Sequence, residues 1–269
     1  MSRPPAAGAR GWGAVFIVGQ GRAGRSLARA WRSAGVDVVG VRRRGGSWRA
    51  VSRASVVVVA VRDRELPAAL AELAAAPLPR RSVVLHTSGA VDATAAAAPL
   101  RAAGHAVGTF HPLVPLADPT QAADRLRGAW VGIEGDPRAT RVARTLARAL
   151  GAHVLPIPHA ARAAYHAAAV IASNFPVVLA AVAQDVMQRS GVPRTMARRA
   201  VHELQRATIE NLAGAEPARA LTGPVARGDA AVVADHEAAL AVDPLVADAY
   251  RVLSRLAQRL VGGRVKRAG

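Results

Sequence analysis

One glycine-rich turn constrains the fold of this chain more than any other feature. The turn follows an apolar run at positions 15–18, and a helical pattern of apolar residues begins soon after it, at positions 26–31. Its residues are Gly19, Gln20, Gly21, Arg22, Ala23 and Gly24. With this spacing the first glycine permits a tight turn, the second lets the backbone approach a pyrophosphate, and the third lets the helix pack on the strand. The segment therefore predicts a strand, turn and helix that bind a dinucleotide, with the pyrophosphate at the helix N-terminus.

The end of the next predicted strand, at positions 36–41, indicates which dinucleotide is bound. NAD sites usually place an Asp or Glu about 20 residues after the glycines, where it binds the ribose 2′-hydroxyl. Here the strand runs into Arg42, Arg43 and Arg44, and no acid follows it directly. Guanidinium groups suit the 2′-phosphate of NADP; the alternative is a solvated basic loop in an arginine-rich chain. We therefore expect NADP(H) as the cofactor, with Arg42 and Arg43 at its 2′-phosphate.

The composition excludes several functions. The 269 residues carry 36 basic and 18 acidic side chains, a formal charge of +18, but Lys266 is the single lysine and the arginines are scattered. This distribution indicates a compositional bias, so we expect no specific nucleic-acid partner. Without cysteines the chain forms no disulfide, thiolate metal site or cysteine nucleophile, and it suits a reducing cytoplasm, where we expect it to act. The eight histidines show no metal-ligand spacing, so we expect no metal.

Strand and helix patterns alternate up to residue 157. Apolar runs predict five further strands, at 55–61, 82–86, 105–110, 130–133 and 153–157. Helical patterns lie between several of them, at 67–75, 93–98 and 138–150. This alternation predicts a Rossmann-type α/β domain over residues 13–157, with a mostly parallel sheet and helices on both faces. The preceding arm, residues 1–12, lacks the layout of a signal peptide and is expected to be mobile.

Beyond Pro158 the alternation stops, and helical patterns follow at 160–189, 193–212, 230–241 and 245–261. They predict an all-helical domain over residues 158–262 and a basic tail over 263–269. Positions 163–183 carry no charge and match a bilayer crossing in length. Polar residues and many alanines interrupt this stretch, so we expect a buried helix and no membrane partner. Its apolar surface needs a cover, which predicts a homodimer through the helical domain.

Polar residues follow three of the predicted strands. In an open parallel sheet, ligands bind outside the carboxyl ends of the strands. Each polar residue at these ends could be a loop, cap or turn residue, but together they predict a crevice for cofactor and substrate. The residues that we expect to line the cofactor there are Val61, Asp63, His86, Ser88 and His111.

The first long helix carries His166, Ser173 and Asn174 on one broad face, given 100° per residue. Polar residues buried in an apolar helix must be hydrogen-bonded, either within the protein or to a ligand. Imidazole titrates near neutral pH, so His166 is the candidate proton donor, with Ser173 and Asn174 orienting the substrate.

A predicted interhelical loop at 221–229 holds the remaining candidates. A Gly-Pro turn and an expected helix cap at Asp229 explain part of this segment. They do not explain Thr222, Arg227 and His236, which we expect to present an anion-binding face to the acid group of a substrate.

These segments, in this order, resemble the Rossmann-like proteins that have a DUF2520 C-terminal domain. The matching pieces are the glycine turn, His86-Thr87-Ser88-Gly89-Ala90, Phe110-His111-Pro112-Leu113, Tyr165-His166 through Ser173-Asn174-Phe175, and Leu221 to Asp229 with His236. The resemblance spans about residues 13–262. The wider group includes 6-phosphogluconate dehydrogenase, ketopantoate reductase, pyrroline-5-carboxylate reductase and F420-dependent NADP reductase. The resemblance implies an NADP(H)-dependent oxidoreductase, usually dimeric, that acts on a small anionic carbonyl or imine compound.

One departure from this group concerns the chemistry. Ketopantoate reductase and its hydroxyacid-dehydrogenase relatives carry a catalytic Lys on the first helix of the second domain, with Asn one and two turns later. In this chain the three positions hold His166, Val170 and Asn174. The resemblance therefore implies nucleotide binding but not Lys-dependent chemistry. The rival hypothesis is a dinucleotide-binding sensor or scaffold protein without turnover.

Overall fold

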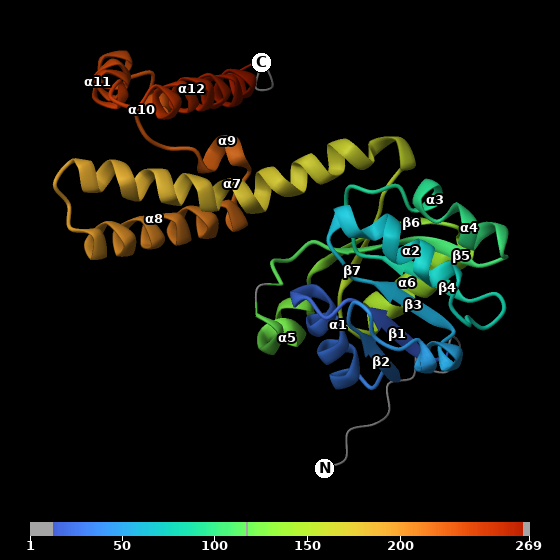
Figure 1. Cartoon of the computed structure of the whole chain (residues 1–269). Helices are drawn as coiled ribbons and strands as arrows, with labels where there is room; N and C mark the ends of the chain where they lie inside the picture. The colour runs from blue at the N-terminus through green and yellow to red at the C-terminus, as the bar shows by residue number, and fades with distance from the viewer. Residues whose placement is uncertain (1–12, 117, 266–269) are drawn as a thin grey trace, which may run out of the picture. The chain divides into compact units, whose positions relative to one another are not determined.

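The computed structural model describes residues 13–116 and 118–265. Its strands form one sheet in the order β2-β1-β3-β4-β5-β6-β7 (Figure 1). They are β1 (Val15–Val18), β2 (Val38–Arg42), β3 (Val56–Val59), β4 (Val83–His86), β5 (Ala106–Pro112), β6 (Trp130–Gly135) and β7 (His153–Pro156). Neighbouring strands pair in parallel except β5 and β6, which are antiparallel. The predicted mostly parallel sheet is confirmed, and the predicted strand ends differ from these by no more than two residues.

Helices cover both faces of this sheet (Figure 1). They are α1 (Arg22–Ser33), α2 (Leu66–Ala74), α3 (Ala93–Ala96), α4 (Ala98–Ala102), α5 (Ala122–Leu126) and α6 (Pro137–Ala149), with the short 3-10 turns η1 (Arg49–Arg53), η2 (Asp63–Glu65), η3 (Pro119–Gln121) and η4 (His159–Ala161). Trp31 of α1 and Leu146 of α6 pack in one core, and Leu70 of α2 and Leu100 of α4 in a second. Every residue of β1, β3 and β4 is buried, which explains their continuous apolar runs.

One predicted helix of this region is wrong in its extent. The pattern at 93–98 predicts a single helix, whereas the chain forms α3 and α4 as two short helices. Pro99 lies in the first turn of α4, where proline is tolerated, but it cannot continue a helix from before it. The predicted arm at 1–12 and the tail residues 266–269 lie outside the described residues.

Helices make up the rest of the described chain. They are α7 (Arg162–Arg189), α8 (Arg194–Gly214), α9 (Pro217–Ala220), α10 (Pro224–Arg227), α11 (Ala230–Leu240) and α12 (Pro244–Val265). The chain divides into two compact units inside α7, since the first ends at Ile171 and the second begins at Ala172. The domain boundary expected at 157–158, where strand patterns end, stays a prediction. The loop predicted at 221–229 contains α10, because Pro224 begins a helical turn after Gly223, whose φ is +92°.

The second unit leaves much of its apolar surface exposed. Only small or β-branched apolar residues, such as Ala197 and Val201, are buried in its described part, whereas Phe175, Val177 and Leu204 are 50%, 70% and 64% exposed. The stretch His159–Arg189 is long and apolar enough to cross a membrane by length and composition, and its most apolar window is not buried within the chain. A core helix of a soluble protein can have the same length and composition. An apolar surface of this size is usually covered by a partner, either another protein surface or a membrane.

Candidate functional site

The glycine turn between β1 and α1 has the geometry that a dinucleotide requires. Gly19 adopts a φ of +115°, and a Cβ atom there would overlap the carbonyl group of Ala60. A Cβ atom on Gly24 would overlap the carbonyl oxygen of Gly19, so this glycine allows the helix to pack on the turn. Gly21 differs from both, since a Cβ atom there would meet nothing within 4 Å. Gly19 and Gly24 are therefore needed for packing within the protein, whereas Gly21 leaves an open approach to the backbone.

The N-terminus of α1 stands at this open approach. Gly21 is the N-cap residue, no side chain caps the helix, and the first turn contains no acidic residue. The first amides of a helix lack partners within it, so this end of α1 can accept an anion. Gln20 ties the turn to the end of β2, because its Nε2 donates to the carbonyl oxygen of Val41 at 3.1 Å. A Cβ atom on Gly19 would also lie 3.3 Å from the side chain of Val61.

The arginines after β2 differ in their surroundings. Arg42 is buried: its Nε donates to the carbonyl oxygen of Gly46 at 2.8 Å, its Nη2 pairs with Glu72 at 2.9 Å, and its guanidinium lies 3.9 Å from the ring centroid of Trp48. Its guanidinium therefore already has protein partners. Arg43 and Arg44 are exposed, and Arg44 lies 3.5 Å from Glu65. Arg42 is thus a poor candidate for binding a 2′-phosphate, whereas Arg43 and Arg44 are accessible to a ligand.

His86 ends β4 as a buried, neutral side chain. Its Nε2 lies 3.4 Å from Oγ1 of Thr109 on the neighbouring strand. Burial, followed by the positive charge of Arg162, lowers the pKa of His86 to about 4. Ser88, two residues later, is also buried, and its Oγ accepts from the backbone N–H groups of Ala90 and Val91 at 3.2 and 3.0 Å. Ser88 therefore stabilises the loop after β4, which is the structural alternative that its sequence position left open.

His111 lies at the end of β5 against the first turns of α7. The sequence left open that His111 and Pro112 form a turn, but β5 continues through both residues, because they pair with β6. The Nδ1 of His111 lies 2.7 Å from the hydroxyl oxygen of Tyr165. The ring of His111 is edge-on to those of Tyr165 and His166, at centroid distances of 5.6 and 5.9 Å. The structure thus brings His111 and His166, predicted as separate site residues, into one cluster.

This cluster is uncharged at its centre. Burial, followed by the nearby His166, lowers the pKa of His111 to about 4, and Asp63 opposes the shift. Burial raises the pKa of Tyr165 to about 12. Asp63 itself is exposed in η2, directly after β3. At neutral pH His111 and Tyr165 are therefore both uncharged, and a single proton lies between His111 Nδ1 and the Tyr165 oxygen in their hydrogen bond.

Two glycines outside the dinucleotide turn make room for the cluster. A Cβ atom on Gly89 would lie 2.7 Å from both His111 and His166. A Cβ atom on Gly132, in β6, would overlap the hydroxyl of Tyr165. Neither glycine has a local sequence signal for this role, because the side chains that it accommodates come from distant segments.

A buried ion pair anchors the start of α7 to the sheet. The guanidinium of Arg162 pairs with Glu134 of β6, and both side chains are less than a tenth exposed. Arg162 also donates to the carbonyl oxygen of Val91 at 2.7 Å and to Oγ1 of Thr109 at 3.4 Å. Because buried charges are stable only when paired and hydrogen-bonded, this network fixes the first turn of α7. His166 lies one turn after Arg162, on the same side of the helix.

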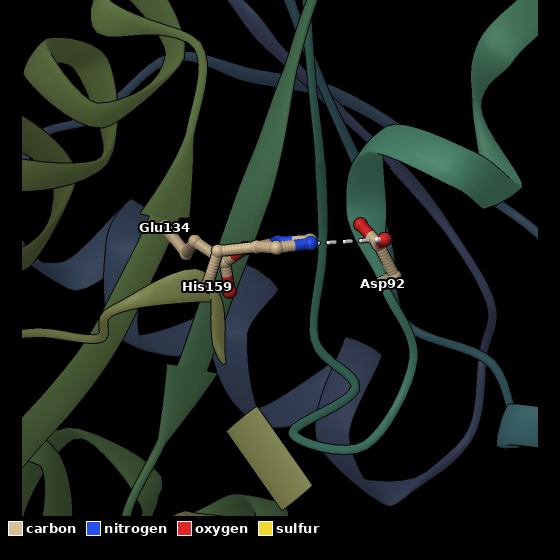
Figure 2. A group of neighbouring side chains, drawn as sticks. All are labelled: Asp92, Glu134 and His159. Carbon is tan, nitrogen blue, oxygen red and sulfur yellow. Dashed lines mark hydrogen bonds and ion pairs between the residues drawn. The ribbon is translucent and has the colours of Figure 1, made fainter. Parts of the chain in front are cut away.

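His159 and Asp92 extend this network toward the surface (Figure 2). The Nδ1 of His159 lies 2.8 Å from Glu134, and its Nε2 lies 3.6 Å from Asp92. Oxygen and nitrogen atoms of these three side chains lie within 4.8 Å of one another, a spacing that could suit a metal ion. The guanidinium of Arg162 already pairs with Glu134 and lies 3.9 Å from Asp92. Arg162 therefore supplies the positive charge, and the arrangement favours an ion-pair network over a metal site.

Sequence reasoning missed this network, although a weak signal exists. Glu134 is an acid at the end of an apolar strand, and Arg162 is the last charge before a long uncharged helix. Opposite charges beside these two apolar segments are compatible with an ion pair between Glu134 and Arg162. Only the packing of β6 beside α7 shows that these two form the pair.

The remaining predicted residues belong to the second unit. Ser173 and Asn174 are exposed, and the Oγ of Ser173 donates to the Oδ1 of Asn174 at 2.8 Å. Arg227 pairs with Asp229 at 2.8 Å, so the expected cap is corrected: Asp229 is the N-cap residue of α11, but its carboxylate binds Arg227 and not the helix.

His236 of α11 has its own partner. Its Nδ1 lies 2.8 Å from the hydroxyl of Tyr250 on α12. Thr222 is exposed between α9 and α10. The substrate-binding roles expected of Thr222, Arg227 and His236 stay predictions.

Comparison with known proteins agrees with this architecture. Residues 129–257 match the family model described as Domain of unknown function (DUF2520). The match covers 129 of the 269 residues, just under half of the chain. The resemblance drawn from the sequence segments is thereby confirmed. No curated protein matches the chain.

Solved structures share the fold over nearly the whole chain. A candidate NADP oxidoreductase of Bacteroides fragilis is 21% identical, with 92% of this chain and 98% of that chain covered and a TM-score of 0.73. A Thermotoga maritima protein is 24% identical, with 93% and 99% covered and a TM-score of 0.73. Pyrroline carboxylate reductase of Plasmodium falciparum, solved with NADP bound, is 10% identical, with 93% and 98% covered and a TM-score of 0.60. These likenesses confirm the predicted α/β fold with C-terminal helices.

Proposed function

We propose that this protein is an NADP(H)-dependent oxidoreductase that transfers hydride to or from a small, anionic carbonyl or imine compound. One observation carries the proposal. The sheet has an open, glycine-lined approach to a helix N-terminus at the end of β1, and an uncharged His–Tyr cluster at the ends of β4 and β5. Ligands of open parallel sheets bind at this carboxyl edge, where a dinucleotide reaches from one strand end to the next.

The residues present fit a dinucleotide. The pyrophosphate would be held by residues 19–24, because Gly21 leaves space and the amides of α1 can accept an anion. Arg43 and Arg44 would bind the 2′-phosphate of NADP, with Arg42 supporting the loop from beneath through Glu72 and Trp48. Proteins of similar fold include one solved with NADP and a ketol-acid reductoisomerase that prefers NADH. The fold accommodates both cofactors, so the preference for NADP rests on the two exposed arginines.

The side chains near the strand ends would support reduction of a polarised double bond. NADP(H), when bound, supplies or accepts hydride at its nicotinamide ring. His166 would donate the proton to the oxygen or nitrogen that gains charge as the substrate is reduced. His86 and His111 would themselves stay neutral at this edge of the sheet. In the second unit, Ser173 and Asn174 would orient the substrate.

The acid group of the substrate would bind to residues of the helical unit. Thr222, Arg227 and His236 offer a hydroxyl, a guanidinium and an imidazole, which together suit a carboxylate. The proposal also includes a cytoplasmic homodimer. It is supported by the apolar surface of the second unit, which this chain alone does not cover.

Turnover by the purified protein tests the proposal directly. NADPH would be mixed with a panel of 2-oxo acids and cyclic imino acids, and its oxidation would be followed by nicotinamide absorbance. We expect oxidation with at least one anionic member of the panel, and slower oxidation of its uncharged amide or ester. Tight NADPH binding without oxidation across the panel would favour the sensor or scaffold hypothesis. Absence of NADPH binding would refute both.

A further inference from the structure

Both tyrosines of this chain are hydrogen-bonded to a histidine. Tyr165 bonds to Nδ1 of His111 at 2.7 Å, and Tyr250 bonds to Nδ1 of His236 at 2.8 Å. The surroundings of the two pairs differ. His111 and Tyr165 are half-buried at the carboxyl edge of the sheet, whereas His236 is exposed on α11. The same chemical pair therefore occurs once in the candidate site and once outside the sheet, which provides an internal control.

The contact between His111 and Tyr165 is built into the packing. Gly132 admits the hydroxyl of Tyr165, because any side chain there would occupy its position. Gly89 admits the ring of His111 beside that of His166. The start of α7, which carries Tyr165, is held by the buried pair of Arg162 and Glu134. Three separate features thus converge on one hydrogen bond.

The hydrogen bond has two possible directions, and the chemistry of the partners favours one. A neutral imidazole carries its proton on either Nδ1 or Nε2, and the other nitrogen accepts. Imidazole nitrogen is a much stronger base than phenol oxygen, so the tyrosine O–H donates and His111 Nδ1 accepts. The charged and titratable groups around His111 are Tyr165 and His166 from α7, His86 from β4 and Asp63 from η2. The hydrogen bond that the structure gives Nδ1 is the one to Tyr165.

We propose that Tyr165 is a positioning residue that holds His111 as its Nε2–H tautomer, so that His111 offers a neutral hydrogen-bond donor to the carbonyl oxygen or imine nitrogen of the substrate. The substrate contact rests on the proposed function, whereas the tautomer does not. His166 and His111 then have separate roles. His166 delivers the proton, and His111 polarises the double bond without carrying charge itself. A carbonyl oxygen has two lone pairs and can accept from both histidines, an imine nitrogen can accept from one of them at a time, and a protonated iminium nitrogen is excluded as the partner of His111.

Nitrogen NMR of the ligand-free full-length protein tests the tautomer. The eight imidazoles would be labelled with ¹⁵N, and His111 would be identified from the signals lost in His111→Gln. We expect the Nε2–H pattern for His111 in the unsubstituted protein and protonation only near pH 4. In Tyr165→Phe the bond that selects this tautomer is lost, so the ¹⁵N signals of His111 should shift toward a mixture of the two neutral tautomers.

The nitrogen pattern decides the direction of the bond. If Nδ1–H donated to Tyr165 instead, the unsubstituted protein would show the Nδ1–H pattern. That pattern, or an unchanged nitrogen pattern in Tyr165→Phe, would overturn the proposal. Gly132→Ala is a second variant, because its methyl group displaces the hydroxyl while Tyr165 is retained. It should change the His111 signals in the same way, at a temperature where melting curves show it folded.

The matched control is Tyr250→Phe. It removes the same type of bond from His236, so it should change the His236 signals and leave those of His111 unaltered. A change at His111 in this control would show that the NMR response is not specific to the contact.

Kinetics then tests the substrate contact separately. With the anionic substrate found in the panel, Tyr165→Phe should lower kcat by roughly 10–100-fold, the usual cost of losing a group that orients a working histidine. The affinity for NADPH should stay the same. An unchanged kcat together with a changed tautomer would overturn the substrate contact. If the unsubstituted protein turned over none of the compounds in the panel, the proposed function and this substrate contact would both fail. The NMR result would still decide the tautomer.

Discussion

Alanine at each of the three turn glycines separates the needs of the fold from those of the cofactor. Gly21 has φ −67° and ψ −177°, which any residue adopts, and a methyl group there meets nothing within 4 Å. Gly21→Ala also reduces the freedom of the unfolded chain, so the free energy of unfolding should stay the same or rise by about 0.4–1 kcal/mol. Gly24→Ala places a methyl group onto the carbonyl of Gly19 and should lower it by about 1–3 kcal/mol. Gly19→Ala adds strain from its φ of +115°.

Gly21→Ala, which the fold should tolerate, should weaken the binding of NADPH. The methyl group of Gly21→Ala occupies the space through which a pyrophosphate would approach the backbone. We expect the affinity for NADPH to fall by at least about tenfold, or about 1.4 kcal/mol. Calorimetric titration with NADPH measures the affinity, and urea unfolding measures the stability of the same sample. Gly262→Ala is the matched control, because this glycine of α12 also faces open space: it should gain stability and bind NADPH normally.

Two results would refute this reasoning. Unaltered NADPH affinity in Gly21→Ala would show that the backbone at Gly21 is not where the pyrophosphate binds. A large loss of stability in the same variant would show that the space around Gly21 is filled in the folded protein.

Four further predictions concern the cofactor, the proton donor, the anchor of α7 and the assembly. Arg43→Ala with Arg44→Ala should remove a preference for NADPH over NADH of about 1.5–3 kcal/mol in calorimetry, since charge-assisted bonds to the 2′-phosphate are lost; equal affinities before substitution would contradict this. His166→Ala should retain NADPH affinity and lose on the order of 10²–10⁴-fold in kcat, whereas an unchanged kcat with a lowered Tm would identify His166 as a packing residue. Glu134→Ala should lower the free energy of unfolding by about 3–5 kcal/mol in urea titration, because it removes the closest partner of the buried Arg162 and leaves it only Asp92 at 3.9 Å; a loss below about 1 kcal/mol would show that Asp92 or water compensates the charge. Light scattering should give twice the chain mass of 27.7 kDa across micromolar concentrations, and a monomer there would refute the dimer.

Local patterns in the sequence determined the secondary structure and the dinucleotide turn. Four consecutive β-branched valines at 56–59 favour a strand covered on both faces, and this is how β3 packs. Gly19, Gly21 and Gly24 needed no distant partner to be recognised, because a tight turn before a helix restricts its residues within six positions. The split between α3 and α4 was missed at Pro99, where a local rule did apply.

Tertiary packing alone decided what the candidate site residues do. Arg42 and Arg43 are adjacent and identical in the sequence, yet Arg42, the last residue of β2, pairs with Glu72, whereas Arg43 lies beyond the strand and is exposed. The bond between His111 and Tyr165 joins residues 54 positions apart, and the one between Glu134 and Arg162 joins residues 28 apart. Such contacts depend on how β5, β6 and α7 pack together, and spacing along the chain carries no information about them. The sequence by itself thus determined the glycine turn that predicts dinucleotide binding, whereas the fold decided which side chains meet at the candidate site, because helices and strands form from neighbouring residues and sites form from distant ones.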